Sequence, residues 1–353
     1  MQHLYIHIPF CESKCNYCAF TSLSKKYEKE YFKALMRDLK FHFRFLNIKK
    51  QSIKTLFIGG GTPSIVDAKF YEEIFKFLNC FLNDKCEITS EANPNSSNEF
   101  WLKEMKNFGV NRLSFGAQSF NEKKLKFLGR NHGQKSIYDS INNAFKLGFK
   151  NINLDLIYDT KLDDKKMLNY EISHLKSIKN LIKHISAYNI SIEKNTAFAN
   201  KEHFKKNAYL LMKYFINSIK ELGFKQYEIS NFGKICKHNL AYWQGKEYLA
   251  CGLSSVSFYK KQRFYTHKTL KEYIQNPIFR DVEKLDDRSL NLEHLFLGLR
   301  SVVGINSNKI SQEQREKAFF LSRAKKLVYN ERKKKFFNPN YLLSDELALF
   351  LQE

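Results

Sequence analysis

The stretch Tyr5-Ile6-His7-Ile8-Pro9-Phe10-Cys11-Glu12-Ser13-Lys14-Cys15-Asn16-Tyr17-Cys18 decides how this chain folds, because a short β-rich run leads directly into three closely spaced cysteines. Three thiolates with the spacing Cys-x3-Cys-x2-Cys on one loop can ligate three corners of a four-iron cluster and leave the fourth iron open. A structural zinc ion needs a fourth ligand, usually from a second close pair of Cys or His, and the sequence contains no such pair. We therefore predict that Cys11, Cys15 and Cys18 bind a [4Fe-4S] cluster.

Five more β-rich runs follow the first, and segments with helical spacing lie between them. The six runs are Leu4–Ile8, Lys54–Ile58, Glu87–Ser90, Arg112–Phe115, Asn151–Ile157 and His184–Ile190. The helical segments include Tyr27–Leu46, Ala68–Leu82, Asn98–Asn107 and Ser136–Leu147. Alternating strands and helices of this kind predict an α/β fold with a parallel sheet, open or curled into part of a barrel.

The unusual residues of the sequence stand where the predicted strands end. After the cysteines these are Gly59-Gly60-Gly61-Thr62-Pro63, Glu91-Ala92-Asn93-Pro94 and Gly116-Ala117-Gln118, with Asp155 near the end of the fifth strand. In parallel α/β folds the carboxyl ends of the strands lie on one side and carry the chemistry. We expect one face to gather a soft-metal site, a glycine loop, two carboxylates and an amide.

The length and composition indicate a globular protein with more than one domain. Of the 353 residues 43% are hydrophobic and 15% aromatic, which excludes a disordered or fibrous chain. The β/α alternation breaks at Asn231-Phe232-Gly233-Lys234, and a short strand (Arg263–Thr266) and helices (Ser289–Arg300 and Gln312–Val328) are expected beyond it. We place a core domain at residues 1–232 and a smaller, mostly helical C-terminal domain at 233–353.

The net charge and the cysteine content limit which classes of partner and which cellular compartment fit the sequence. The net charge of +23 raises nucleic acid or an anionic membrane as partners, but the lysines are dispersed, which favours a solvated basic surface over a nucleic-acid site. Seven cysteines, three of them clustered, are not typical of a disulfide framework. With neither a signal-peptide pattern nor a transmembrane run, we expect a cytoplasmic protein whose charge permits peripheral contact with anionic lipids.

The cysteine stretch and the Ala19-Phe20 that follows it resemble the signature of the radical S-adenosylmethionine (SAM) superfamily, in the HemN/HemW branch of coproporphyrinogen oxidases and haem chaperones. The resemblance continues through Gly59–Ser64, Glu91–Pro94, Arg112–Phe120, Leu128–His132, Asp155–Tyr158, His184–Tyr188 and Tyr227–Phe232. It implies a partial (β/α)6 radical-SAM barrel, in which the open iron chelates the amino and carboxylate groups of SAM.

The resemblance also implies which residues contact SAM. They are Tyr5, Tyr17, Gly60, Gly61, Thr62, Glu91, Gln118, Arg130 and Asp155. Glycines allow close backbone approach and offer amide donors, carboxylates suit the ammonium and ribose hydroxyls, and the fork of Arg130 suits the carboxylate of SAM. The alternative for the polar side chains is that they cap loops at strand ends.

Three features favour the HemW side of the branch. The oxidases that the chain resembles carry a fourth cysteine where Phe20 stands, and a longer segment before Tyr5. The run His238-Asn239-Leu240-Ala241-Tyr242-Trp243 also matches a His-Asn-x-x-Tyr-Trp motif associated with haem in HemW-like proteins. The resemblance implies His238, Tyr242 and Trp243 as haem contacts, with His238 or Cys236 as an axial ligand; alternatively, His238 and Trp243 seal the domain interface.

Two segments depart from the family pattern. After Tyr158 the family usually has Gly-Leu-Pro-Gly-Gln, where this chain has Asp159-Thr160-Lys161-Leu162-Asp163. After Gly252 a Gly-Ala-His-Ser type sequence is replaced by Leu253-Ser254-Ser255-Val256-Ser257. The second change removes a histidine from the expected wall of the tetrapyrrole site and leaves the cluster ligands unaffected.

The function that these observations favour is haem handling. Such a protein binds haem, the cluster and SAM, passes haem to an acceptor protein and takes electrons from a donor such as flavodoxin or ferredoxin. The alternative is an oxygen-independent coproporphyrinogen III oxidase, in which a SAM-derived radical abstracts hydrogen from propionate side chains. Another radical SAM reaction, including modification of nucleic acid, is a third reading. Whether the chain is an enzyme stays open, and no catalytic residue is predicted.

Overall fold

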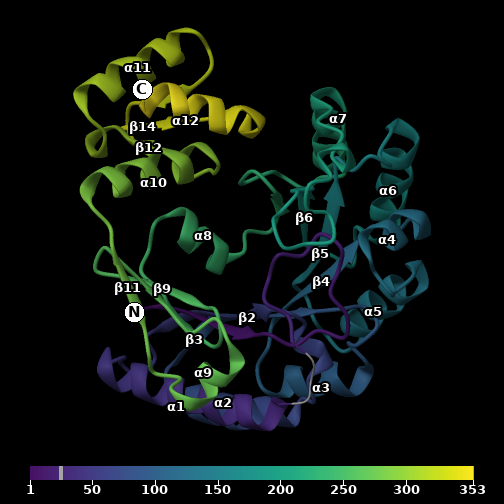
Figure 1. The fold of residues 1–353 in the computed structure, drawn as a ribbon. Helices are drawn as coiled ribbons and strands as arrows, with labels where there is room; N and C mark the ends of the chain where they lie inside the picture. Colours follow the sequence, from purple (N-terminus) through teal and green to yellow (C-terminus); the bar gives the residue numbers. More distant parts are fainter. Residues whose placement is uncertain (24–26, 353) are drawn as a thin grey trace.

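The computed structural model describes residues 1–23 and 27–352, and its central element is an eight-stranded sheet (Figure 1). Six of its seven parallel strands are β1 (His3–Ile8), β2 (Ile53–Gly60), β3 (Leu82–Ala92), β4 (Arg112–Gln118), β5 (Ile152–Tyr158) and β6 (His184–Asn189). The short β7 (Asn231–Gly233) pairs antiparallel with β6, and β8 (Leu249–Cys251) pairs parallel with β1 at the opposite edge. The predicted parallel sheet is confirmed.

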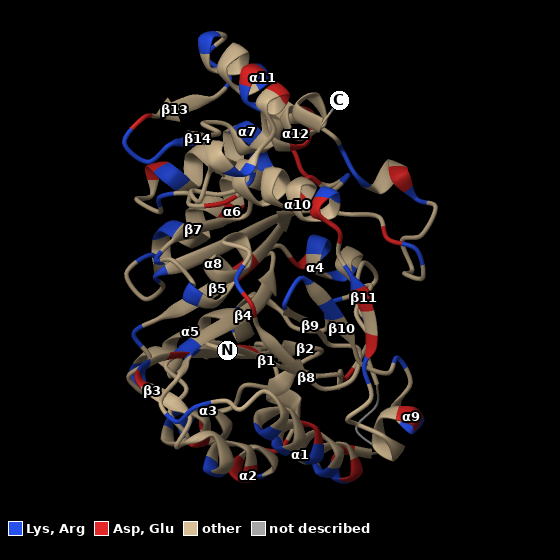
Figure 2. Ribbon diagram, turned by 90° about the vertical axis from the view of Figure 1, so that its left-hand side faces the viewer, with Lys and Arg blue, Asp and Glu red and all other residues tan. Residues whose placement is uncertain are grey.

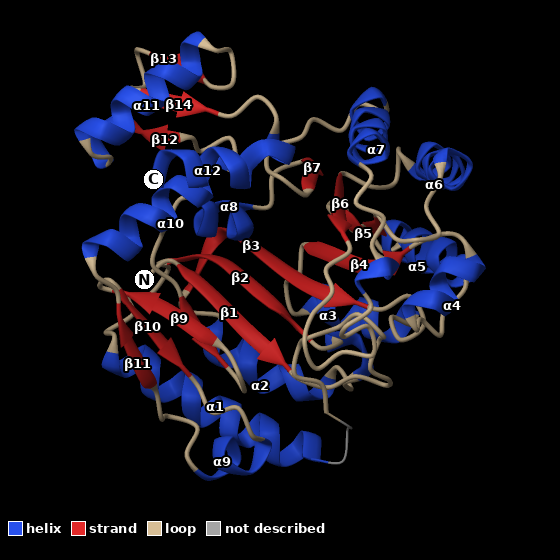
Figure 3. Cartoon of the chain, turned by 45° about the horizontal axis from the view of Figure 1, so that its top comes forward, coloured by secondary structure: helices blue, strands red, loops and turns tan. Residues whose placement is uncertain are grey.

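Helices return the chain from the end of each parallel strand to the start of the next. They are α1 (Glu28–Phe45), α2 (Lys69–Leu78), α3 (Glu99–Asn107), α4 (Glu122–Leu128), α5 (Gln134–Lys146), α6 (Lys165–Ile178) and, after β6, α7 (Tyr209–Glu221). Figure 3 shows the curved sheet with α1 to α6 on its outer side, which is the expected partial (β/α)6 barrel. The helix predicted for Ala68–Leu82 ends earlier, at Leu78, because Leu82 already pairs with Ile53 at the start of β3.

The C-terminal third combines short strands with helices. Its elements are α8 (Lys237–Trp243), β9 (Val256–Tyr259), β10 (Gln262–Tyr265), α9 (Leu270–Gln275), β11 (Asp281–Lys284), α10 (Asp287–Leu299), β12 (Ile305–Asn306), α11 (Gln312–Arg323), β13 (Val328–Asn330), β14 (Lys335–Phe337) and α12 (Ser344–Gln352). The second helix predicted here ends at Arg323 rather than Val328, since Val328 starts β13. Helices α10 to α12 enclose an apolar cluster of their own, which includes Leu295 and Phe336.

The division of the chain into domains at residue 232 remains our proposal. The central sheet takes β8 from beyond that position, and Figure 1 shows α8 between the sheet and the elements α10 to α12. Lysine and arginine residues are spread over many helices and loops in Figure 2, as the sequence pattern indicated. Among the described helices, none combines the length and the apolar character needed to span a bilayer.

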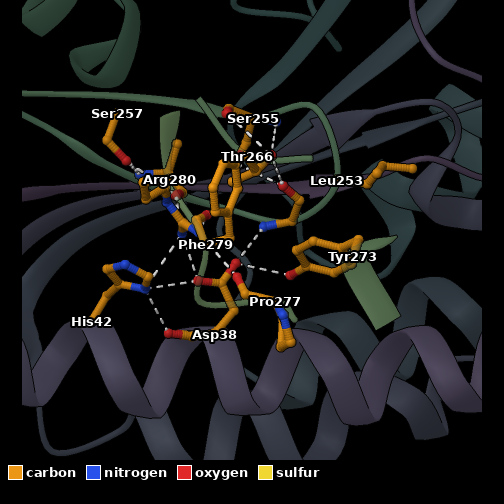
Figure 4. A network of polar contacts seen from close by, with 12 residues as sticks. Asp38, His42, Leu253, Ser255, Ser257, Thr266, Tyr273, Pro277, Phe279 and Arg280 are labelled. Atoms are coloured by element: carbon orange, nitrogen blue, oxygen red, sulfur yellow. Dashed lines mark hydrogen bonds and ion pairs between the residues drawn. The ribbon is translucent and has the colours of Figure 1, made fainter. Parts of the chain in front are cut away.

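A buried carboxylate links α1 to the C-terminal segments (Figure 4). Asp38, which has no exposed surface, accepts hydrogen bonds from the hydroxyl of Tyr273 at 2.8 Å, the amide of Gly252 at 3.0 Å and a guanidinium nitrogen of Arg280 at 2.6 Å. Burial would raise the pKa of Asp38, but the hydrogen bond from His42 and the charge of Arg280 lower it overall. The carboxylate is therefore ionised and fixes the end of β8 against α1.

We predict that Asp38→Ala destabilises the protein by about 3 kcal/mol, because it leaves the Arg280 charge buried and uncompensated. The side chain of Arg280 is only 7% exposed. The matched control is Asp345→Ala, which removes an ion pair to Arg300 whose carboxylate is 63% exposed and should cost under about 1 kcal/mol. Urea unfolding of both variants measures the difference, and equal losses would contradict the structural role of Asp38.

Candidate functional site

A cavity of about 570 Å³ opens at the carboxyl ends of the parallel strands and contains most of the predicted cofactor residues. It is lined by Cys11, Cys15, Tyr17, Cys18, Gly60, Gly61, Thr62, Glu91, Gln118, Arg130 and Asp155. We call it the cluster cavity. The gathering of cysteines, glycine loop, carboxylates and amide on one face, which strand order alone predicted, is therefore present.

The cysteine loop leaves β1 at its buried end and is closed by backbone hydrogen bonds. The amide of Cys11 donates to the carbonyl of Leu23 at 3.0 Å, and the amide of Leu23 donates to Pro9 at 2.8 Å. These two bonds join the start of the loop, at Pro9 and Cys11, to its end at Leu23. The three thiols that the loop carries are half-buried. Burial raises the pKa of Cys11 and of Cys18, so in the free chain these thiols favour the protonated form.

Two hydrogen-bond donors point at the sulfur atoms. The Nη1 of Arg130 lies 3.2 Å from Sγ of Cys15, and the hydroxyl of Thr62 lies 3.7 Å from Sγ of Cys11. A cation and a hydroxyl directed at sulfur stabilise the thiolate, which is the form that binds iron. The donor set of the cluster cavity thus fits three thiolate ligands.

The backbone amides of the glycine loop have hydrogen-bond partners within the protein. The amides of Gly61 and Thr62 donate to the carbonyls of Ile8 and Phe10, each at 2.7 Å, and the amide of Gly60 donates to Oε2 of Glu91 at 3.0 Å. These amides, which we expected to serve a ligand, are therefore already used within the protein. The loop instead allows close packing of β2 against the start of the cysteine loop.

The two carboxylates of the cluster cavity are partly buried, and the pKa of each is raised. Burial, and then the charge of Asp155, raises the pKa of Glu91 to about 8, against the opposing effects of the Gly60 amide and Arg112. Burial also raises the pKa of Asp155, although hydrogen bonds from Ser186 and Asn153 oppose the shift. A cationic ligand with hydroxyl groups would lower the pKa of both carboxyl groups, because it favours their ionised forms.

The guanidinium of Arg130 bridges the cysteine loop and the sheet, and both of its terminal nitrogens have partners in the protein. Its Nη2 donates to the carbonyl of Gly116 at 2.7 Å, and its Nη1 faces the sulfur of Cys15. Each of these nitrogens carries a second hydrogen, and among the described residues no atom accepts from Nε of Arg130, so its predicted contact with the SAM carboxylate stays a prediction. Gln118, at the end of the same strand, has a left-handed backbone with φ of 68° and still lines the cluster cavity.

Tyr5, which the resemblance implies as a SAM contact, does not line the cluster cavity. It lines a second cavity of about 190 Å³ inside the barrel, which we call the barrel cavity. There its hydroxyl contacts Nδ1 of His7 at 3.1 Å, and its ring stacks on Phe57 with centroids 6.1 Å apart. The barrel cavity adjoins the cluster cavity, since Glu91, Ser114, Asp155 and Tyr188 line both.

Helix α8 places the predicted haem residues on two different sides. His238 and Tyr242 are four residues apart and both line the barrel cavity, whereas Trp243 lies about 140° around the helix from His238 and about 100° from Tyr242 and lines a groove outside the barrel. The two nitrogens of His238 contact Oγ1 of Thr55 and the hydroxyl of Tyr242, each at 2.7 Å. Burial lowers the pKa of His238 to about 3, so this imidazole is neutral and has both nitrogens engaged.

Cys236, the alternative haem ligand, is also enclosed. Its side chain has no exposed surface, and its sulfur lies 3.5 Å from Oε1 of Glu87. Burial raises the pKa of this thiol to about 11. In this arrangement neither Cys236 nor His238 is presented to an external iron atom, and their predicted role as axial ligands would need α8 to move.

Sequence reasoning missed the polar residues that point into the barrel from the strands. Ser114, Asn153 and Ser186 form a hydrogen-bonded group around Asp155, in which Asn153 Nδ2 donates to both Ser114 Oγ and Asp155 Oδ1 at 2.6 Å. A buried strand that carries polar residues at alternate positions has a polar interior face. The run Asn153-Leu154-Asp155 shows this alternation, so the signal was present in the sequence.

Comparisons with known proteins agree with the geometry. Residues 5–170 match the model of the Radical SAM superfamily. The heme chaperone HemW of Bacillus subtilis is 32% identical over 333 residues, which cover 89% of this chain and 87% of the relative. This chain belongs to the HemW family of radical SAM proteins. HemW of Lactococcus lactis is 29% identical over 99% of the chain and 93% of its own length.

The HemW family shares its fold with coproporphyrinogen III oxidase. The structure of HemN from Escherichia coli superposes with a TM-score of 0.80, covering 99% of this chain and 90% of HemN, at 19% sequence identity. At that identity the match shows the fold alone. Membership of the radical SAM superfamily confirms the two cofactors expected from the cysteine spacing, a [4Fe-4S] cluster and SAM.

We predict that SAM binding near pH 7 releases close to one proton from Glu91. The folded-state pKa of about 8 lies above the ordinary 4.5, so the proton is held below pH 8 and is lost as the pH rises through that value. A bound cation favours the ionised carboxylate and therefore expels the proton. Calorimetric titration in buffers of different ionisation enthalpy counts it. Glu91→Gln should bind SAM without proton release, and a wild-type titration that is independent of buffer would contradict the prediction.

Proposed function

We propose that this protein is a haem chaperone that binds haem, a [4Fe-4S] cluster and SAM and passes haem to an acceptor protein. The observation that carries the proposal is the 32% identity to a protein named heme chaperone HemW over almost the whole of both chains. SAM bound at the cluster supplies reductive radical chemistry. The cysteine loop, Arg130 and Thr62 would hold the cluster, and Glu91 and Asp155 would orient SAM.

The residue after the cysteine loop supports a chaperone over an oxidase. Phe20 stands where the oxidases that the chain resembles have a fourth cysteine, and its side chain is 66% exposed at the rim of the cluster cavity. An exposed aromatic side chain next to a redox centre is suited to contact with another protein. We propose that a flavodoxin or ferredoxin delivers electrons at this rim.

A groove outside the barrel has the shape and charge for haem. This groove, about 1020 Å³ in volume, lies between α8 and the elements α10 to β14 and includes the aromatic side chains Trp243, Phe258 and Phe337. Its lining also includes Lys261, Lys309, Lys333 and Lys335 beside Asp287 and Glu293, and Lys261 is paired with Asp287. A lining with aromatic side chains and an excess of lysines suits a flat molecule that bears carboxylates. We propose that haem lies against Trp243, with His294, which also lines the groove, as a nearby imidazole.

Anaerobic titration with haem tests the function. The reconstituted protein should bind haem stoichiometrically and should not convert coproporphyrinogen III in the presence of SAM and a reductant. Trp243→Ala should weaken haem binding by at least about tenfold, the effect of losing a large aromatic contact. His238→Ala and His294→Ala, compared by the absorbance of bound haem, identify the iron ligand. Turnover of coproporphyrinogen III without haem binding would overturn the proposal in favour of the oxidase.

A further inference from the structure

A buried arginine faces the barrel cavity without a hydrogen-bond acceptor. Arg112, at the start of β4, is 1% exposed and lines this cavity. Among the residues that the structure describes, no atom accepts a hydrogen bond from its Nε or its Nη1. Its Nη2 makes one contact, to Nδ1 of His184 at 3.5 Å.

The contact with His184 is not a hydrogen bond from Arg112, because the neighbouring groups fix the imidazole tautomer. Asn153 donates its Nδ2 hydrogens to Asp155 Oδ1, so its amide oxygen faces His184. The Nδ1 of His184 therefore carries the hydrogen and donates to that oxygen. On the other side of the ring, the hydroxyl of Tyr227 accepts from the amide of Cys236 and donates to Nε2 of His184 at 2.7 Å. Within residues 1–23 and 27–352, the N–H groups of the Arg112 guanidinium are therefore left without an acceptor.

The charge of Arg112 is retained despite its burial. Burial would lower the pKa of the guanidinium, but Cys236, Glu87 and Asp155 raise it overall. These acids act from a distance: Glu87 accepts hydrogen bonds from Cys236 and the amide of His238, and Asp155 accepts from its own strand neighbours. A buried cation with unsatisfied donors is costly, so its presence beside a cavity indicates that an acceptor binds there.

The residues around Arg112 indicate which kind of acceptor group the barrel cavity can bind. The planar fork of a guanidinium matches the two oxygens of a carboxylate. A dianionic phosphate would be repelled more strongly than a singly charged carboxylate by Asp155, which lines the same cavity. Hydroxyl and amide groups of Ser186, Asn239 and Tyr242 complete the lining and suit a singly charged polar group. We propose that the barrel cavity binds the carboxylate group of a ligand and that Arg112 anchors it.

The carboxylate has two sources that the experiment must separate. One is a propionate side chain of haem, which would extend the proposed function into the barrel. The other is a small free carboxylic acid that enters through the adjoining cluster cavity. The proposal itself rests on Arg112 and its surroundings and does not depend on haem transfer.

The first experiment uses the full-length, anaerobically reconstituted protein with sodium propionate as the probe. Propionate should raise Tm by about 2 °C at a concentration well above its Kd, whereas neutral propionamide and matched sodium chloride should not. Arg112→Met should abolish the shift, Arg112→Lys should reduce it, and Arg44→Met, which removes an exposed arginine, should leave it unchanged. The wild-type comparison of propionate with propionamide stands even if Arg112→Met fails to fold.

The second experiment compares haem with its dimethyl ester by absorbance titration. If haem supplies the carboxylate, the wild-type protein should bind the ester at least about tenfold more weakly, and Arg112→Met or Arg112→Lys should shrink this ratio. If a free acid supplies it, the ratio should not depend on Arg112 while the propionate shift does. A propionate shift that is absent, or that survives in Arg112→Met, would overturn the proposal and leave a cavity holding only water. Failure to bind haem would instead contradict the proposed function alone.

Discussion

Cys15→Ser is expected to abolish the cluster: anaerobically purified protein should contain close to zero iron and sulfide instead of about four of each per chain. Cys15 is one of the three predicted thiolate ligands, and its sulfur receives the N–H of Arg130 at 3.2 Å. A serine hydroxyl is a much weaker ligand for the cluster iron than a thiolate, because it is not ionised at neutral pH. Reductive cleavage of SAM should be lost together with the iron.

The control for this variant is Cys80→Ser. Cys80 is an exposed free thiol that follows α2, so its replacement should leave iron content and SAM cleavage unchanged. Iron and sulfide analysis of both proteins decides the assignment. A Cys15→Ser protein that retained a full cluster, or a Cys80→Ser protein that lost it, would contradict the assigned ligand set.

Gly60→Ala is expected to destabilise the protein by about 4 kcal/mol or more, which is exceptional for the addition of one methyl group. Gly60 has φ of +114°, and a Cβ at this position would lie 2.5 Å from Cε1 of His7. The imidazole of His7 is buried beneath the loop and holds the hydroxyl of Tyr5, so it has little room to move. The backbone strain and the steric clash therefore add.

Gly223→Ala separates the two causes. Gly223 also has a positive φ of +99°, but a Cβ there would meet no atom within 4 Å. Gly223→Ala should therefore lower the free energy of unfolding only by the cost of the left-handed backbone conformation, about 1–2 kcal/mol. Chemical unfolding of the two variants gives the difference, and similar losses would show that His7 yields to the added methyl group.

The positions of the cofactor residues were predictable because strand order determines where strand ends meet. Cys11 follows β1, Glu91 lies in β3 and Asp155 lies in β5, yet parallel pairing of these strands brings the three residues to one cavity. That inference needs only the alternation of strands and helices. It does not need side-chain detail.

The use of the glycine amides and the direction of Arg130 were not predictable in the same way. A triple glycine indicates close approach but does not say whether a ligand or a neighbouring carbonyl receives the N–H groups. Here Ile8 and Phe10 receive two of them, because β1 and β2 are adjacent strands whose ends leave the sheet together. The partners of Arg130 likewise depend on the path of the cysteine loop, which no local pattern encodes.

The seven-residue helix α8 lines both the barrel cavity and the groove proposed for haem. One side, with His238, Asn239 and Tyr242, closes the barrel cavity, while Leu240 and Trp243 face the groove proposed for haem. A helix of two turns held at both ends cannot shift on one side without shifting on the other. If haem displaces α8, its affinity and that of a ligand in the barrel change by the same factor, because binding linkage is reciprocal. Binding of haem and binding of a ligand in the barrel cavity are then coupled. A ligand that enters or leaves the barrel cavity, which adjoins the cluster cavity, would therefore change the affinity of the protein for haem.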